Sequence, residues 1–261
     1  MSTDLQSPHS LPRTDPAPGS GPARPGGPAP HLLDNAAWAA LNGPHRRFAE
    51  IVGSAARYQT DVAPFVALGD AADPRAWDDL AALVGPGAVT AVTGIRSVPD
   101  HWETVQQASG VQLVADTLRT RSDPEAVRLT PADVPEMLDL VSRAKPGPFL
   151  PRTIELGAYW GIRRGGRLVA MAGERLRPPG HTEISAVCTD AGHRGQGLAT
   201  RLVRHVADGI RDRGDVPFLH AAGDNENAIR LYLSIGFALR VRTLFAVVRV
   251  PGGDPAAAPG I

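Results

Sequence analysis

Arg194-Gly195-Gln196-Gly197-Leu198-Ala199 stands between two different periodic patterns. Before it, residues 183–189 read as a strand, and after it apolar side chains recur at helical spacing as far as Gly214. A helix start exposes unpaired backbone N–H groups and the positive end of the helix dipole, and glycines without a Cβ let an anion approach the main chain. The segment therefore predicts a strand-to-helix turn that binds an anion.

Other glycine-rich motifs fit this segment less well. A phosphate-binding P-loop would require a Gly-Lys-Ser or Gly-Lys-Thr sequence, which is absent here. The dinucleotide-binding fingerprint would need a third spaced glycine and an acidic residue after a second strand. From this segment alone, a glycine-rich connection that binds nothing also stays open.

A second motif follows one strand later. After the strand predicted at residues 217–221, the sequence reads Asn225-Glu226-Asn227-Ala228-Ile229-Arg230-Leu231-Tyr232-Leu233-Ser234-Ile235-Gly236-Phe237. Together with Val187-Cys188-Thr189 and the Arg-x-x-Gly-x-Ala pattern of residues 194–199, this motif resembles the GNAT superfamily of N-acetyltransferases. The resemblance covers roughly residues 126–250, with both motifs in the family's order.

The resemblance implies an α/β (α+β) fold, in which helices flank a mixed, mainly antiparallel sheet and acyl-CoA lies in a splayed gap between two central strands. Acetyl-CoA is then the expected co-substrate, with its pyrophosphate on the loop and its pantetheine arm along the strand end. The implied cofactor-binding residues are Val187, Cys188, Thr189, Arg194, Gly195, Gln196, Gly197, Leu198, Ala199, Thr200 and Asn225. Because the histidines are scattered without ligand spacing, we expect no metal.

Glu183 is the predicted general base. An alkylammonium with a pKa near ~10 must lose a proton before it can attack an acyl group. Because side chains alternate along a strand, Glu183 is expected to share a face with Ser185, Val187 and Thr189 and to act directly or through water. The other interpretation is a solvated carboxylate at the strand end. His220, on the next strand, is a reserve candidate for the base.

Tyr232 is the predicted general acid. The resemblance implies that its side chain faces the thioester sulfur, where a hydroxyl could protonate the departing thiolate. A core tyrosine is the alternative. Cys188 is expected to alternate onto the face of Ile184 and Ala186 as a small buried apolar residue, so an acyl-cysteine intermediate is not expected.

The wall that binds the acceptor is expected from three segments. These are the loop at residues 145–156, the strand end near Trp160 and a last hairpin around residues 240–243. Arg152, Arg240 and Arg242 could hold a carboxylate there, and the alternative is that they are ordinary surface arginines.

The chain divides by composition into two halves between two tails. Residues 1–30 and 251–261 are rich in Pro and Gly and are predicted to be disordered. Residues 31–122 are predicted to form a mixed α/β half that resembles a degenerate GNAT-like domain, and the resemblance implies that residues 123–250 are the GNAT-like acyl-CoA-binding catalytic domain. In the first half, Trp38, Leu41 and residues 48–52 have helical spacing, and strands are predicted at residues 62–68, 88–93, 102–106 and 111–115.

Composition limits the class of function. Lys and Arg total 27, as do Asp and Glu, so no global positive charge attracts nucleic acid or a membrane surface. The one cysteine and the lack of a signal-like or membrane-spanning stretch favour the cytoplasm. We expect an N-acyltransferase that joins acetyl-CoA to a small-molecule or peptide amine by direct attack in a ternary complex, with a homodimer among the expected assemblies. The alternative is a non-catalytic acyl-CoA-binding sensor or partner module.

Overall fold

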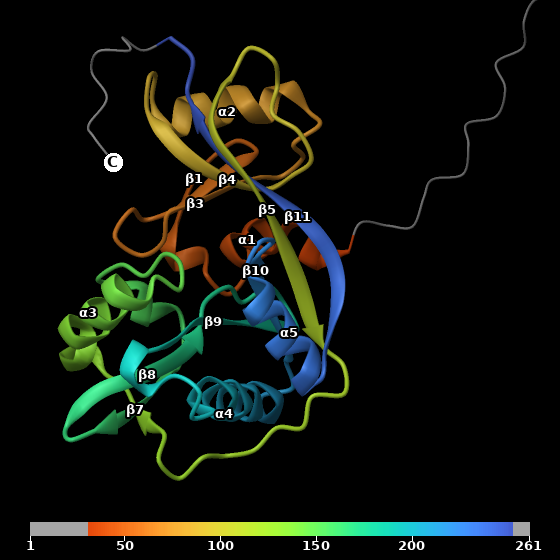
Figure 1. The fold of residues 1–261 in the computed structure, drawn as a ribbon. Helices are drawn as coiled ribbons and strands as arrows, with labels where there is room; N and C mark the ends of the chain where they lie inside the picture. Colours follow the sequence, from red (N-terminus) through yellow and green to blue (C-terminus); the bar gives the residue numbers. More distant parts are fainter. Residues whose placement is uncertain (1–30, 253–261) are drawn as a thin grey trace, which may run out of the picture. The chain divides into compact units, whose positions relative to one another are not determined.

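Eleven strands form one continuous sheet within residues 31–252, the part of the chain that the computed structural model describes (Figure 1). The tail predicted at residues 1–30 lies outside this range, as do residues 253–261 of the tail predicted at residues 251–261. The strands are β1 (Ala49–Val52), β2 (Ala55–Tyr58), β3 (Phe65–Leu68), β4 (Val89–Ile95), β5 (Glu103–Ala115), β6 (Val127–Arg128), β7 (Tyr159–Arg164), β8 (Arg167–Glu174), β9 (His181–Thr189), β10 (Val216–Ala222) and β11 (Phe237–Arg249). Their order across the sheet is β1-β2-β3-β4-β11-β5-β10-β9-β8-β7-β6.

Most neighbouring strands are antiparallel. Of the pairs within residues 31–252, β3 with β4 and β9 with β10 are parallel, and each of these pairs is connected through a helix. The helices are α1 (Ala36–Leu41), α2 (Pro74–Val84), α3 (Val134–Ala144), α4 (Leu198–Asp212) and α5 (Glu226–Ile235). The predicted fold class, a mixed and mainly antiparallel sheet flanked by helices, is confirmed. None of the helices between His31 and Gly252 is both long and apolar enough to span a bilayer.

Local sequence signals explain where the helices begin and end. The Asp73 side chain accepts a hydrogen bond from the N–H of Arg75 at 3.0 Å, and Pro74 occupies the first turn of α2. Gly85 ends α2 at a φ of 94°. Before α3, Thr130 and Asp133 form the capping box that their spacing predicts.

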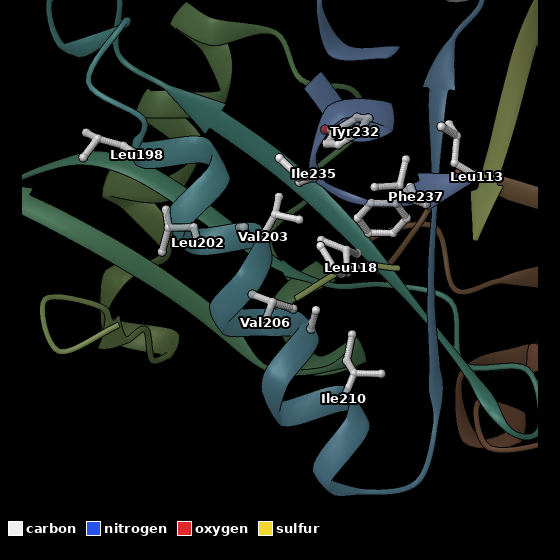
Figure 2. Packing of buried hydrophobic residues seen from close by; sticks show 14 of the residues in the cluster. Leu113, Leu118, Leu198, Leu202, Val203, Val206, Ile210, Tyr232, Ile235 and Phe237 are labelled. Atoms are coloured by element: carbon white, nitrogen blue, oxygen red, sulfur yellow. The ribbon is translucent and has the colours of Figure 1, made fainter. Parts of the chain in front are cut away.

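Helices cover both faces of the C-terminal part of the sheet. Along one side of α4, Val203, Val206 and Ile210 pack with Leu118 and with residues of α5 and β11 (Figure 2). On β8, Ala172 belongs to this α4 cluster, whereas the preceding residue, Met171, packs in the α3 cluster. Because neighbouring strand residues point to opposite faces, α3 and α4 lie on opposite sides of the sheet.

Three predicted elements are wrong. Residues 49–52, expected in a helix, form β1. The two strands expected at residues 102–106 and 111–115 are one strand, β5, because β11 pairs with it from Ala115 to Glu103. The last hairpin expected around residues 240–243 is absent from this region, which lies inside the continuous strand β11. Long-range pairing thus overrides local preference in these segments.

A buried histidine makes the stability of this fold depend on pH. The His45 side chain is 3% exposed, and its Nδ1 lies 2.9 Å from the hydroxyl of Tyr58. Burial, together with the smaller effect of the positive charges of Arg177 and Arg47, lowers the pKa of His45 to about 4. In the unfolded chain the pKa is ~6.5, so between about 4 and ~6.5 the unfolded state binds more protons than the folded state.

We therefore expect the free energy of unfolding to decrease as the pH falls from ~6.5 toward about 4, by about 3 kcal/mol from this group. His45→Gln keeps an acceptor for Tyr58 and removes the titration, so it should flatten this dependence. Urea unfolding at pH 4 to 7 measures the effect. The exposed His101→Gln is the control, and equal slopes for wild type and His45→Gln would contradict the prediction.

Candidate active site

β9 and β10 separate partway along their length. Their parallel register runs from His181 opposite Val216 to Glu183 opposite Phe218 and then ends. Beyond that point, β10 pairs with β5 on its other edge as far as Ala222, and β9 pairs with β8 as far as Thr189. The facing edges of residues 184–189 and 219–222 therefore make no ladder with each other. This divergence is the splayed gap that the resemblance implies.

A bulge at Ala186 changes the direction of the side chains in β9. Ala186 has a φ of 52°, and the register of β8 with β9 shifts between Met171 and Gly173. Ile184 packs in the α4 cluster, whereas Ala186 and Cys188 pack in the α3 cluster. The uniform alternation predicted for this strand is therefore wrong, and Cys188 does not share the face of Ile184. Cys188 is buried, as expected, and burial raises the pKa of its thiol to about 12.

The glycine segment forms an open helix start. Gly195 and Gly197 have φ values of 76° and 71°, which favour glycine, and a Cβ at either position would meet no atom within 4 Å. Gly197 is the N-cap of α4, a helix of 15 residues, and no side chain caps it. Leu198 is buried and anchors the first turn in the core, so it offers only its main chain to a ligand. The loop thus has free space above uncapped N–H groups, which suits a pyrophosphate.

The corresponding helix in the first half is closed to anions. α2 connects the parallel strands β3 and β4 as α4 connects β9 and β10. At its start, however, the Asp73 carboxylate caps the helix and Pro74 has no N–H group. The Asp73 carboxylate would repel a phosphate at the start of α2. Of these two helices, only α4 is therefore suited to bind a phosphate.

Two residues of the second motif lie at the two ends of α5. Asn225 is exposed, and its Oδ1 accepts a hydrogen bond from the N–H of Ala228 at 3.1 Å as the N-cap. The Tyr232 side chain, near the other end, is 8% exposed and packs in the α4 cluster. Burial raises the pKa of Tyr232 to about 12, and the Cys188 thiol adds to this shift. Tyr232 therefore keeps its proton at neutral pH.

Glu183 is fully buried in an ion pair. Its Oε1 and Oε2 lie 2.7 and 2.9 Å from Nη2 and Nε of Arg175, and the Leu176 N–H donates to Oε2 at 3.3 Å. Burial alone would raise the pKa of Glu183, but Arg175 and then His220 outweigh burial and hold this pKa well below its usual range. The interpretation as a solvated carboxylate is wrong. The zero exposure of Glu183 also leaves no free face for a direct contact with an amine.

His220 connects this buried carboxylate to the surface. Its Nδ1 lies 2.8 Å from Oε1 of Glu183, and its side chain is 27% exposed. The register could have indicated this contact, because Glu183 pairs with Phe218 and His220 is the next residue on the same face of β10. Arg175 continues the pairing of β8 with β9, because its N–H donates to the carbonyl oxygen of Glu183 at 3.0 Å, directly after Glu174 pairs with Ile184.

The expected acceptor wall is not assembled as predicted. Arg152 is held by Glu155 and Asp61, whereas Arg240 is held by Asp34. Arg242 lines a separate hollow of about 320 Å³ between α5 and β11. The Trp160 ring packs against His205 of α4, with ring centroids 4.3 Å apart. The three arginines thus do not form one carboxylate-binding site, and Trp160 lies in the α4 layer.

Comparison with known families places this site among acetyltransferases. The family described as FR47-like protein matches residues 159–246. The N-alpha-acetyltransferase RimI of Mycobacterium tuberculosis is 39% identical over 99 residues, which is 37% of this chain and 61% of that protein. An uncharacterized protein of Mycobacterium leprae is 33% identical over 219 residues, or 74% of this chain and 58% of that protein. The chain thus spans about 60% of the length of these two curated relatives.

Solved structures extend the comparison to most of the chain. The crystal structure of a putative acetyltransferase of the GNAT family from Novosphingobium aromaticivorans is 37% identical, with a TM-score of 0.77, and the match covers 84% of this chain and 98% of that one. A GCN5-related N-acetyltransferase from Kribbella flavida is 18% identical, with a TM-score of 0.56 over 84% of this chain and 96% of that one, and it supports the fold alone.

Proposed function

This chain belongs to the GNAT family of acetyltransferases, and from this membership we propose that it transfers an acetyl group from acetyl-CoA to a primary amine. The observation that carries the proposal is the open, uncapped start of α4 directly beyond the point where β9 leaves β10. Direct attack of the amine within a ternary complex is the proposed course, because buried Cys188, with its pKa raised to about 12, is a poor nucleophile.

The proposed binding residues follow the main chain of β9 into α4. The peptide groups of Val187, Cys188 and Thr189 lie on the edge of β9 that has left β10, so they are suited to pair with the pantetheine amides. The loop from Arg194 to Thr200 offers its N–H groups, and exposed Arg194 adds a positive charge. Exposed Asn225 provides a side-chain amide at the start of α5.

For the base we propose that His220 receives the proton of the amine and that Glu183 orients it. When bound, acetyl-CoA supplies the acyl group as an activated thioester. The Glu183 carboxylate binds Nδ1–H of His220, which leaves Nε2 as the nitrogen that can accept a proton. The imidazolium that forms is stabilised by the same carboxylate. Glu183 thus acts through His220, in keeping with its burial.

For the acid we propose that the Tyr232 hydroxyl donates a hydrogen bond to the departing sulfur. Its pKa of about 12 lies above a thiol pKa of ~8.5, so complete transfer of the proton would be unfavourable by about 5 kcal/mol. A hydrogen bond stabilises the thiolate without that cost, and solvent supplies the proton afterwards.

Release of coenzyme A from acetyl-CoA in the presence of an amine panel tests the proposed function. The panel should include peptides with a free N-terminus, because one relative is named as an N-alpha-acetyltransferase, together with small primary amines. Amine-dependent release supports the proposal. Stabilisation by acetyl-CoA in a thermal-shift assay, with no turnover on any amine, would instead favour an acyl-CoA-binding sensor.

Replacing Gly197 with alanine should weaken the binding of acetyl-CoA. Its φ of 71° costs an alanine about 1–2 kcal/mol, and the added Cβ would enter the open space above the loop. We expect the Kd for acetyl-CoA, measured by calorimetry, to rise about tenfold, equivalent to a loss of about 1.4 kcal/mol in binding free energy.

Gly165→Ala is the matched control for this variant. Gly165, in the turn between β7 and β8, also has a positive φ, 55°, and a Cβ there would also meet open space. Both variants should lose similar stability, but only Gly197→Ala should weaken acetyl-CoA binding. Equal Kd values in the two variants would contradict the assigned role of the loop.

A further inference from the structure

Gln112 connects the first half of the chain to His220. It lies on β5, where it is 1% exposed and directly opposite His220 in the register of β5 with β10. Its amide nitrogen lies 3.0 Å from Nε2 of His220 and 2.8 Å from the carbonyl oxygen of Leu33. Its amide oxygen accepts a hydrogen bond from Nε of Arg240. The nitrogen of the Gln112 amide therefore has two hydrogen-bond partners, and its oxygen has one.

A bulge in β11 brings Arg240 to this position. The register of β11 with β5 shifts between Leu239 and Val241, so Arg240 is an extra residue next to Val241, which is the partner of Gln112. Its Nη2 also lies 2.5 Å from Oδ1 of Asp34, near the start of the described chain. Arg240 is thus held between Asp34 and Gln112 and is restrained from moving away.

These contacts decide the orientation of the Gln112 amide. A guanidinium can only donate hydrogen bonds, so the atom that faces Arg240 must be the amide oxygen. A peptide carbonyl can only accept, so the atom that faces Leu33 must be the amide nitrogen. The second N–H of that nitrogen points at Nε2 of His220, which must then be the accepting nitrogen. Nδ1 carries the ring proton and donates it to Glu183.

This arrangement leaves no place for a second ring proton. The Glu183 carboxylate accepts the proton of Nδ1, and a ring protonated on both nitrogens could not serve as a base. A proton on Nε2 would point at the Gln112 NH₂ group, and the amide cannot turn over without placing its NH₂ group against Arg240. The charged and titratable groups around His220 and its partners are Glu183, His181, Arg175, Arg240, Asp34 and His31.

We infer that Gln112, fixed by Leu33 and Arg240, is a positioning residue that keeps His220 neutral with Nε2 ready to accept a proton. The inference rests on the proposed function insofar as His220 receives the proton of the amine. It gives the N-terminal half of the chain a role in the reaction, because Gln112 and Leu33 both precede the C-terminal half. For the transfer, the Gln112 N–H must give up its contact with Nε2 while the contacts of the amide with Leu33 and Arg240 remain, and the ammonium then transfers its proton to Nε2.

The protonation state of His220 can be measured without catalysis. Histidine ring ¹⁵N shifts of the full chain at pH 7, assigned by comparison with His220→Gln, should show a bare Nε2 and a protonated Nδ1. In Gln112→Glu, a carboxylate faces Nε2, so the ring should become an imidazolium at the same pH. A wild-type ring that is already cationic at pH 7, or that carries its proton on Nε2, would overturn the inference.

The pH profile of kcat/KM gives the second readout. In Gln112→Glu the acidic limb should move up by about one pH unit or more, so that the rate below this limb falls about tenfold and recovers at higher pH. Arg240→Met, which frees the amide to turn, should move the limb in the same direction by less. Gln107→Glu is the control, because it adds the same charge at an exposed position of β5.

The two readouts separate the possible failures. A Gln112→Glu variant that loses kcat/KM by the same factor at every pH, with a neutral His220 ring, would mean that Gln112 is merely structural. If the wild type shows no turnover on any amine, the proposed function fails, while the ring shifts still decide whether Gln112 keeps His220 neutral. If circular dichroism shows that Gln112→Glu is unfolded, the pH profile of Arg240→Met and the ring shifts of wild-type His220 test the inference instead.

Discussion

Tyr232→Phe should lower kcat about a hundredfold while leaving the Kd for acetyl-CoA within about twofold of wild type. In the proposed role the hydroxyl contacts only the departing sulfur, whereas the ring packs in the α4 cluster and is unchanged in phenylalanine. Because the pKa of Tyr232 is raised to about 12, the residue stays protonated across the working pH range. The loss should therefore be similar at every pH between ~6 and ~9.

Tyr159→Phe is the matched control for this prediction. Tyr159 is also buried, and its hydroxyl has no hydrogen-bond partner among the described residues. Its removal should leave kcat unchanged. Steady-state kinetics with the best amine of the panel, combined with calorimetric binding of acetyl-CoA, measures both variants. A Tyr232→Phe variant with normal kcat and weakened binding would rule out the proposed acid role.

Glu183→Gln should lower the free energy of unfolding by about 3–5 kcal/mol at pH 7, because it leaves the Arg175 guanidinium without its counter-charge in a buried site. The double variant Glu183→Leu with Arg175→Met removes both charges and should recover most of this loss. Glu226→Gln is the control, since it breaks the exposed pair with Arg230 and should cost less than about 0.5 kcal/mol.

The ion pair of Glu183 with Arg175 also predicts how the free energy of unfolding depends on pH in the acidic range. The pKa of Glu183 is lowered in the folded state, so its contribution is complete above the unfolded value of ~4.3 and is lost as the pH falls below it. The dependence on His45 falls mainly between pH ~6.5 and about 4 and levels off below that range, so most of it precedes the loss of the Glu183 contribution. Urea unfolding below pH 4 should show a steeper acid dependence in wild type than in Glu183→Gln, in which other paired carboxylates such as Asp123 still titrate. If Glu183→Gln alone were as stable as wild type, the predicted loss of stability would be contradicted.

Glu183→Gln also tests the proposed route of the proton. A glutamine oxygen can still accept the Nδ1–H of His220, but it no longer stabilises the imidazolium. The acidic limb of the kcat/KM profile should therefore move to lower pH. An unchanged profile in a folded variant would exclude Glu183 from the proton route altogether.

Short-range patterns in the sequence determined where helices begin, because a helix start depends only on residues that are close together in the chain. The glycines at 195 and 197 predicted the open start of α4, and the local capping signals at Asp73 and Thr130 account for the starts of α2 and α3. Each of these features requires a backbone conformation or a hydrogen bond within a few residues. The two family motifs then indicated the fold class, which the structure and its relatives confirm.

Tertiary structure alone decided the chemistry of Glu183 and His220. The sequence presented Glu183 as a strand-end carboxylate, and its environment comes from Arg175 beyond β8 and from His220 on β10. Gln112 is 108 residues away from His220 in the chain, and a bulge at Arg240 fixes its amide. Strand register and bulges bring these groups together, and they depend on the packing of the whole sheet. For that reason the sequence indicated the proposed acetyl-CoA loop, while only the assembled sheet showed how the proposed base is held.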